Sequence, residues 1–371
     1  MKKFLSVVLV LVLALSLAAC GSEGSGNNGG NTSSDLRVCY VVSALGDNSF
    51  ADSCDTGLKE AQRDFGITYD CQQVGEDGVI NGVREAAQNG YDIVVSGYSS
   101  DIRALLDAES KDYPDTIFFL YDNTDTSYVP NDNVLAVVFG ANESDFVTGA
   151  IAALQSKTKV TGWVGGQENT GLYDFLVGWV EGVKYADPNA STAYSWVAGS
   201  SPWSDPAKAK ELTKSLYNNY KADIMHGVAG QSGDGVIEAV LELRDAGDDS
   251  VWDIGVDSDQ YAVFAANDKM DTAEVILTSC MKNPMAPMNG FVETLLAGEK
   301  IPGGHLTRGI KDDACGIAEN DFFKANASEQ TLKLIEQQKA AIKNDEIVVS
   351  TSYGLSTEEL AAFLAAHSFH Q

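Results

Sequence analysis

The chain is long, acidic and rich in apolar residues: it has 371 residues, 25 Lys and Arg against 53 Asp and Glu, and a formal net charge of −28. This charge argues against binding to DNA or RNA, which depends on basic side chains that neutralise phosphates, and it opposes electrostatic adhesion to an anionic bilayer. Because 44% of the residues are hydrophobic, a sizeable core can form and disorder is not predicted. The length suggests two domains or one unit with two lobes.

The N-terminus predicts export and lipid anchoring. Lys2 and Lys3 precede an apolar run over residues 4–19, which is short for a transmembrane helix and typical of a secretory signal peptide. The run ends in small residues before Cys20, which resembles the bacterial lipobox. We therefore expect residues 1–19 to be a lipoprotein signal peptide, and Cys20 to carry acyl chains such as palmitate that hold the protein on the extracytoplasmic face of the cell membrane. Each buried methylene would contribute about 0.8 kcal/mol. The alternative is an ordinary signal peptide with an incidental Cys.

A tether follows the lipidation site. Residues 21–34 are Gly, Ser, Asn and Thr with one Glu and no apolar side chain, so they cannot contribute to a core. We expect residues 20–35 to be a flexible tether. A lipid, a tether and an acidic folded part together describe a protein that works just outside a membrane.

Five further cysteines lie in the folded part, at Cys39, Cys54, Cys71, Cys280 and Cys315. Disulfides are permitted outside the cytoplasm, but an odd count leaves at least one thiol free. Two bridges are conceivable, one among the first three residues and one between the last two. The simpler interpretation is that most of them are small buried apolar residues.

From Asp35 onward, short apolar runs alternate with amphipathic segments. The predicted strands cover residues 36–42, 67–74, 93–95, 117–120, 134–139, 160–164, 193–197, 224–225, 251–256 and 275–277. The predicted helices cover residues 58–65, 79–89, 102–110, 146–155, 172–185, 205–220, 236–246 and 332–342. Near-continuous apolar strands that alternate with helices indicate parallel sheets with right-handed crossovers.

The alternation of strands and helices occurs in both halves of the chain. It predicts an α/β protein of two doubly wound parallel-sheet lobes. We expect an N-terminal lobe of residues 36–142 plus about 272–303, and a C-terminal lobe of residues 143–271 plus about 304–350. Residues 351–371 form a C-terminal tail to which we assign no role.

Motifs of common enzymes are missing. The sequence has no G-x-S-x-G, P-loop, H-E-x-x-H or G-x-G-x-x-G motif, and only four histidines. His226 ends a predicted buried strand and is interpreted as a structural histidine. The stretch 122–125 lacks the spacing of a calcium loop and is interpreted as a solvated turn. We expect no catalytic residue, no metal and no cofactor.

Loops at the carboxyl ends of parallel strands are the usual ligand site of open α/β sheets. They supply two aromatics (Phe50 and Trp203), several carboxylates, glycines and one lysine. Aromatic rings stack on flat rings, carboxylates accept pairs of hydroxyl protons, and lysine donates to oxygens. The set suits a small molecule with a planar base and a sugar. The loops expected at this edge cover residues 46–50, 97–99, 200–205, 227–233, 257–260 and 278–283.

The same segments carry a resemblance to a known family. The chain resembles the basic membrane protein (BMP) family of bacterial lipoproteins, which are substrate-binding components of ABC importers related to purine nucleoside receptors. The most specific part is the run 255–260 followed by Thr278-Ser279 and Lys282. The matching segments, in family order, are residues 46–50, 113–115, 164–166, 182–185, 205–211, 255–260 and 277–283.

The resemblance implies a fold like that of type I periplasmic binding proteins, with two lobes joined by a hinge. It also implies a monomer that captures a nucleoside, favouring a purine, and delivers it to the permease subunits of an ABC importer. By the match to the family's motifs, Phe50 and Trp203 would stack on the base, at about 1–3 kcal/mol per stack. Five further residues complete the implied site: Asp47 and Asn48 would contact the base edge, while Asp257 would take two ribose hydroxyls. Lys282 and Gly230 would make the remaining ribose contacts.

Departures from the family pattern concern mainly the base. Ala51 stands where relatives often have Asn, residues 229–233 differ from the usual Ala-Gly-Gly-Thr-Gly, and Trp203 replaces a smaller Phe. Four of the site residues also have a structural interpretation. Phe50 could staple the first helix, Trp203 could cover a lobe edge, Asp257 could be a helix N-cap, and Lys282 could be a surface charge at a helix start.

Two other functions remain open on the residues alone. The same fold could bind a sugar, a flavin-like heterocycle or a signalling molecule, because two aromatics and a diol-seeking Asp also fit a pyranose. An extracellular nucleoside-processing enzyme is the third hypothesis, but it would need a metal cluster or a general acid near the sugar. The base preference, the affinity and the permease are not determined by the sequence.

Overall fold

The computed structural model describes residues 35–370. The expected signal peptide (residues 1–19), the lipidation site Cys20 and all but the last residue of the tether (residues 20–35) lie outside the described residues. Within the described residues, no helix combines the length and the apolar character needed to cross a membrane.

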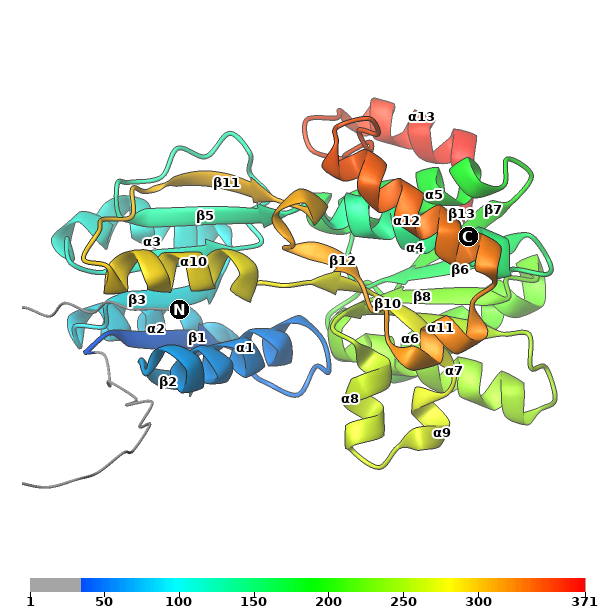
Figure 1. The fold of residues 1–371 in the computed structure, drawn as a ribbon, viewed down its shortest axis with the longest axis horizontal. Helices are drawn as coiled ribbons and strands as arrows, with labels where there is room; N and C mark the ends of the chain where they lie inside the picture. The colour runs from blue at the N-terminus through cyan, green and yellow to red at the C-terminus, as the bar shows by residue number, and fades with distance from the viewer. Residues whose placement is uncertain (1–34, 371) are drawn as a thin grey trace, which may run out of the picture. The chain divides into compact units, whose positions relative to one another are not determined.

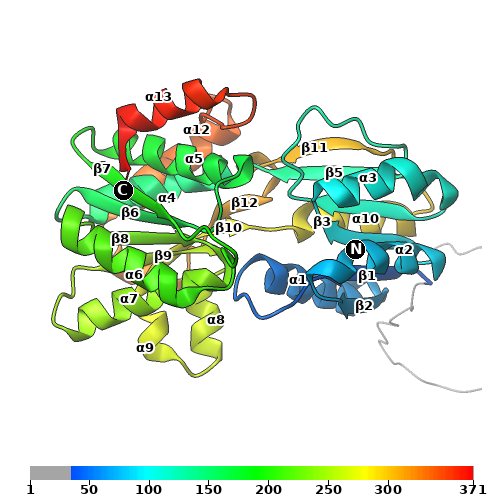
Figure 2. The ribbon, with the colours of Figure 1, turned by 180° about the vertical axis from the view of Figure 1, so that it is seen from behind.

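The first lobe is built on a six-stranded sheet in which every neighbouring pair is parallel, in the order β11-β5-β4-β3-β1-β2. Its strands are β1 (Arg37–Val42), β2 (Thr68–Gln73), β3 (Ile93–Gly97), β4 (Ile117–Tyr121), β5 (Val134–Phe139) and β11 (Gly304–Arg308). Its helices are α1 (Phe50–Phe65), α2 (Val79–Gln88), α3 (Ser100–Glu109) and α10 (Met285–Leu296), with short turns η1 (Glu76–Gly78) and η2 (Ser110–Asp112). Helices α1 and α10 pack in one hydrophobic cluster with one face of the sheet, while α2 and α3 cover the other (Figures 1 and 2).

The second lobe is built on a seven-stranded sheet in the order β12-β10-β9-β8-β6-β7-β13. All its pairs are parallel except β12, which runs antiparallel to β10. Its strands are β6 (Val160–Gly165), β7 (Ser191–Trp196), β8 (Ile224–Val228), β9 (Trp252–Asp257), β10 (Ile276–Lys282), β12 (Cys315–Ile317) and β13 (Ser368–His370).

Helices cover both faces of the second sheet. Helices α4 and α5 share a hydrophobic cluster with one face, and α6 to α9 cover the other. The helices and helical turns are α4 (Ala141–Gln155), α5 (Thr170–Ala186), α6 (Pro206–Ser215), η3 (Leu216–Tyr220), η4 (Gly230–Gly233), α7 (Asp234–Asp245), α8 (Gln260–Ala266), α9 (Met270–Ala273), η5 (Ile310–Asp312), α11 (Asp321–Asn326), α12 (Glu329–Lys343) and α13 (Thr357–His367).

The sequence pattern explains this architecture. Every residue of β5 and of β8 is buried, as strands covered on both faces require. Pro206 opens α6 at its first position, and the Asp205 carboxylate caps the helix by accepting from Lys208 N–H. The predicted α/β fold with two doubly wound, mostly parallel sheets is confirmed.

The lobe boundaries differ from those expected. Strand β10 pairs with β9, so residues 276–282 belong to the second sheet, whereas β11 pairs with β5 and returns residues 304–308 to the first. We expected the chain to pass back to the first lobe at about residue 272 and to the second lobe at about residue 304. Both positions lie too early, because β10 ends at Lys282 and β11 ends at Arg308. The chain crosses between the sheets three times, after β5, after β10 and after β11. The strand predicted at residues 275–277 covers only the start of β10, because the pattern assigns the polar Thr278, Ser279 and Lys282 to the loop after it.

The C-terminal tail is part of the second lobe. Helix α13 begins at Thr357 with a capping box between Ser356 and Glu359. Strand β13 then pairs in parallel with β7 and extends the second sheet at its edge.

The five cysteines of the described chain are all free, and four of them are buried. Cys39 and Cys54 lie in different hydrophobic clusters, on opposite faces of the first sheet. Cys280 lies opposite Ile317 rather than Cys315. The conceivable bridges are therefore not formed, and the interpretation as small buried apolar residues fits all but the partly exposed Cys71.

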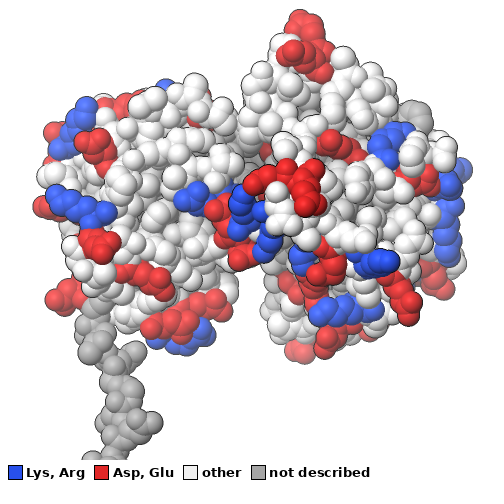
Figure 3. Space-filling view, turned by 45° about the horizontal axis from the view of Figure 1, so that its top comes forward, with Lys and Arg blue, Asp and Glu red and all other residues white. Residues whose placement is uncertain are grey.

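Charged side chains of both signs are mixed on one face of the molecule. On the face seen in Figure 3, Asp and Glu side chains are interspersed with Lys and Arg, and no continuous basic area covers this face. This face therefore lacks the basic stripe that binding to a phosphate backbone needs.

Candidate ligand-binding site

A cavity of about 580 Å³ lies at the carboxyl ends of strands from both sheets. The last residues of β1, β4, β8, β9 and β10 reach its wall, as the strand-end rule for open α/β sheets predicts. Its volume falls within the range of about 300–1,000 Å³ that is usual for small-molecule sites. The wall consists of residues 42–47, 49–51, 76, 121–122, 172, 175, 200–204, 228–231, 257 and 282.

Most of the predicted site residues meet in this cavity. Asp47, Phe50, Trp203, Gly230, Asp257 and Lys282 all line it, whereas Asn48 does not. Of the predicted loops, only residues 97–99 contribute nothing to the wall.

The two predicted aromatics differ in their surroundings. Phe50 is the first residue of α1 and packs against Tyr121 and Phe139, at ring centroid distances of 4.9 and 5.8 Å. It therefore joins the core and lines the cavity at once. Trp203 is 39% exposed and rests near the backbone of Gly166, where an added Cβ would lie 2.6 Å from its ring. Much of the indole ring is free to contact a ligand.

Asp257 ends β9 in a left-handed backbone conformation with φ of +63°. Its Oδ2 accepts a hydrogen bond of 2.8 Å from the Ser49 hydroxyl, and its Oδ1 is buried without a hydrogen-bond partner among the described residues. Burial raises the pKa of this carboxyl to about 6, although the nearby Lys282 ammonium lowers it. Asp257 is not the N-cap of the next helix: Asp259 caps α8 through Ala262 N–H. An unpartnered carboxylate oxygen in a cavity wall can accept a hydroxyl from a ligand.

Lys282 ends β10 and is nearly buried, so it is not a surface charge. Its Nζ lies 3.0 Å from Asp122 Oδ1 and 3.9 Å from Asp257 Oδ1. The rings of Phe50 and Phe175 lie 5.0 and 4.7 Å from the ammonium. Burial lowers the pKa of Lys282, but the carboxylates of Asp122 and Asp257 raise it by more. The net shift is upward, so the side chain is charged.

Asp122 was missed as a site residue. The sequence interpretation placed it in a solvated turn, but it directly follows β4, lines the cavity and binds Lys282. The strand-end rule that selected the other loops could have found it, because β4 is a central strand of the first sheet.

Asp47 and Asn48 have structural contacts of their own. The Asp47 carboxylate accepts backbone N–H groups from Ser49, Ala51 and Asp52 and so caps α1, while burial raises its pKa. Asn48 has a φ of +50°, and its carbonyl accepts from side chains of the second lobe rather than facing the cavity. The contact of Asn48 with a ligand stays a prediction.

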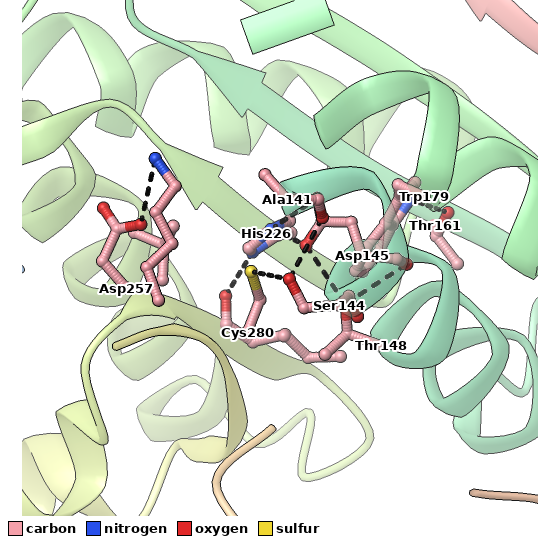
Figure 4. A network of polar contacts seen from close by, with 12 residues as sticks. Ala141, Ser144, Asp145, Thr148, Thr161, Trp179, His226, Asp257 and Cys280 are labelled. Carbon is pink, nitrogen blue, oxygen red and sulfur yellow. Dashed lines mark hydrogen bonds and ion pairs between the residues drawn. The ribbon is translucent and has the colours of Figure 1, made fainter. Parts of the chain in front are cut away.

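A second polar cluster lies in the core of the second lobe and surrounds His226 (Figure 4). Nδ1 lies 2.7 Å from the Ile254 carbonyl oxygen and must carry a proton, and Nε2 lies 3.2 Å from both carboxylate oxygens of Asp145. The pKa of His226 is raised above its usual value: burial lowers it, but Asp145, the Ile254 carbonyl and Asp253 together raise it more. In the protonated ring, Nε2 donates to Asp145. Trp179 stacks on the ring. The interpretation as a structural histidine fits these contacts, and the nearby Cys280 thiol contacts Ser144.

Two doubly wound sheets with a ligand-sized cavity at their strand ends define a class, the solute-binding proteins of two lobes. The ABC transporter solute-binding protein from Aeropyrum pernix K1 has the same fold, with a TM-score of 0.73 and 20% identity over 90% of this chain and 99% of that one.

Within this class, the chain belongs to the Bmp family of PnrA-like ABC transporter substrate-binding proteins, whose family model matches residues 36–352. It is 28% identical to the ABC transporter nucleoside-binding protein BmpA of Lactococcus lactis, over 94% of this chain and 99% of that protein. It is 27% identical to the CD4+ T-cell-stimulating antigen of Listeria innocua, over 93% of this chain and 97% of that protein. The family consists of substrate-binding proteins rather than enzymes.

Proposed function

We propose that this protein is a lipid-anchored receptor that captures a nucleoside, with a preference for purines, outside the cytoplasm and delivers it to the permease of an ABC importer. The observation that carries the proposal is that Asp257 lies in the same cavity wall as Phe50 and Trp203, with no hydrogen bond to its Oδ1 from any described residue. A free carboxylate oxygen suits sugar hydroxyls, and two aromatic side chains suit a planar base.

The charges around the cavity disfavour an anionic ligand. Four carboxylates line it, from Asp47, Glu76, Asp122 and Asp257, and Lys282 is the one basic residue among the lining residues. Because Lys282 is already paired with Asp122, it has no spare charge for an anion. A nucleoside meets this condition, and the nucleoside-binding name of the Lactococcus lactis relative supports the same choice.

The mechanism is conformational. The cavity wall takes Phe50 and Asp122 from the first lobe, and Trp203, Asp257 and Lys282 from the second. A ligand that contacts both lobes stabilises the closed arrangement by the difference between its affinities for the closed and open states. The closed receptor with its cargo would then be what the permease receives. Anchoring through Cys20 rests on the lipobox-like sequence and completes this proposal.

Calorimetric titration of the protein without its signal peptide tests the ligand class. Adenosine, guanosine, inosine, uridine and cytidine are titrated, with glucose and arabinose as sugars without a base. We expect binding of at least one purine nucleoside and none of either sugar. Failure of all five nucleosides to bind would refute the proposal, and binding of a free sugar would assign the site to sugars instead.

Two Asp variants show whether the bound nucleoside uses this cavity. Asp257→Ala should abolish binding. Asp268→Ala is the matched control, because Asp268 also has a left-handed backbone, with φ of +58°, but is exposed and outside the cavity. It should bind like the native protein. Equal affinities of the two variants would place the ligand elsewhere.

A further inference from the structure

The start of α1 carries a serine that does not cap its helix. Ser49 occupies the N-cap position, where a serine side chain normally accepts a backbone N–H, but it makes no such hydrogen bond. The Asp47 carboxylate takes that role through three backbone N–H groups. The Ser49 hydroxyl is thus free for another partner, although only 1% of the residue is exposed.

That partner belongs to the other lobe. Ser49 Oγ donates to Asp257 Oδ2 at 2.8 Å, between residues 208 positions apart. Two further bonds join the same segments, since Ser258 Oγ and Gln260 Nε2 donate to the Asn48 carbonyl at 2.9 and 3.1 Å. All three bonds run between the loop before α1 and residues 257–260, from the end of β9 to the start of α8.

We infer that Ser49 is a positioning residue that orients the Asp257 carboxylate for the ligand when the two lobes meet. This inference rests on the proposed function. With Oδ2 held by Ser49, the carboxylate can rotate little, and Oδ1 is the oxygen left for a ligand hydroxyl. Since the two residues belong to different sheets, the bond breaks when the lobes separate. The same contact therefore links the orientation of the ligand-binding carboxylate to closure.

Removal of the hydroxyl tests the inference. Ser49→Ala and Ser49→Gly should each weaken nucleoside binding by about 10- to 100-fold, the usual effect of losing a hydrogen bond to a charged group. Ser49→Thr keeps the hydroxyl and should restore most of the affinity. Ser328→Ala is the matched control: the Ser328 side chain does cap its helix, α12, through Thr331 N–H. That variant should melt earlier than the native protein and bind with native affinity.

The pH profile of binding separates positioning from a general structural effect. The groups that face Asp257 are Lys282, Asp122, Ser49 and Asp47, and the Ser49 hydrogen bond lowers its pKa. The affinity should fall as the pH is lowered, because protonation of Asp257 removes an acceptor for the ligand hydroxyls. In Ser49→Ala the pKa of Asp257 is higher, so half of the affinity should be lost at a higher pH than in the native protein.

The native protein and the Ser49 variants together distinguish failure of this inference from failure of the proposed function. If the native protein binds no nucleoside, the proposed function fails first. If the native protein binds and both Ser49 variants bind equally well with an unshifted pH profile, Ser49 does not position Asp257. A collapse of the melting temperature in both variants would also overturn the inference, because the hydroxyl would then be needed for folding.

Discussion

At the scale of single residues, Asp257 has a buried carboxylate that lowers the stability of the fold and can accept hydrogen bonds from a ligand. Its carboxylate is nearly buried, its backbone is left-handed, and Oδ1 lacks a hydrogen-bond partner among the described residues. Such features lower stability and are enriched at functional sites. Lys282 offsets part of the burial, but the pKa of Asp257 still rises to about 6.

The raised pKa predicts a stability gain for Asp257→Asn that depends on pH. Above about pH 6 the folded native protein holds a buried charge that the unfolded chain exposes to water, so this group lowers the free energy of unfolding. Below pH 4 the carboxyl is protonated in both states and the difference vanishes. We expect the ligand-free variant to be more stable than the native protein at pH 8, by up to about 3 kcal/mol.

Urea unfolding at pH 8, 6 and 4 measures this difference. Asp268→Asn, at an exposed Asp with the same left-handed backbone, serves as the control and should show no such trend. A variant of Asp257 that is less stable than the native protein at pH 8 would contradict the assignment of an ionised, poorly solvated carboxylate.

At the scale of elements, α4 and α5 form the platform behind the cavity. They lie side by side (Figures 1 and 2), and glycines allow backbone contact between them. A Cβ added at Gly149 would overlap the Trp179 carbonyl, and one added at Gly182 would overlap the Phe146 carbonyl. Helix α5 also places Phe175 in the cavity wall, so its close packing on α4 fixes part of the site.

The close packing predicts opposite effects of the same substitution in two helices. Gly182→Ala in α5 should lower the free energy of unfolding by about 1–3 kcal/mol, because the methyl group meets backbone that cannot move aside. Gly290→Ala in the exposed part of α10 should raise it by about 0.5–1 kcal/mol, since nothing lies near the added Cβ and Ala is the better helix former. Urea unfolding compares both variants with the native protein. Native stability in Gly182→Ala would show that the two helices are farther apart.

At the scale of the whole described chain, three crossings and the contacts around the cavity connect the two lobes. A ligand that binds residues of both lobes adds a further connection that exists only in the closed state. Its binding free energy is therefore added to the stability of both lobes together.

This connection predicts the response of thermal unfolding to ligand. At a nucleoside concentration of 100 times Kd, the native protein should gain about 2.7 kcal/mol and unfold in one transition at a higher temperature. Differential scanning calorimetry measures the shift, and Asp257→Ala should show none. Two separate transitions, of which only one moves with ligand, would mean that the ligand contacts a single lobe.

The sequence by itself determined the fold class and most of the cavity wall. Apolar strands such as β5 indicate burial on both faces, and parallel strands bring the loops after them to one edge of their sheet. This rule placed Phe50 at the edge of the first sheet, and Trp203 and Asp257 at the edge of the second. These features follow from local periodicity and from a general rule of topology, so they need no knowledge of distant contacts.

Only the tertiary structure decided the contacts between residues far apart in the chain. The assignment of β10 and β11 to their sheets depends on strand pairing, which local polarity did not reveal. The roles of Ser49 and Asp122 depend on hydrogen bonds to Asp257 and Lys282, more than 150 positions away. A hydroxyl and a carboxylate in a loop look alike whether they face water, cap a helix or reach another lobe. The free energy that selects among these partners comes from burial, and burial is a property of the assembled fold.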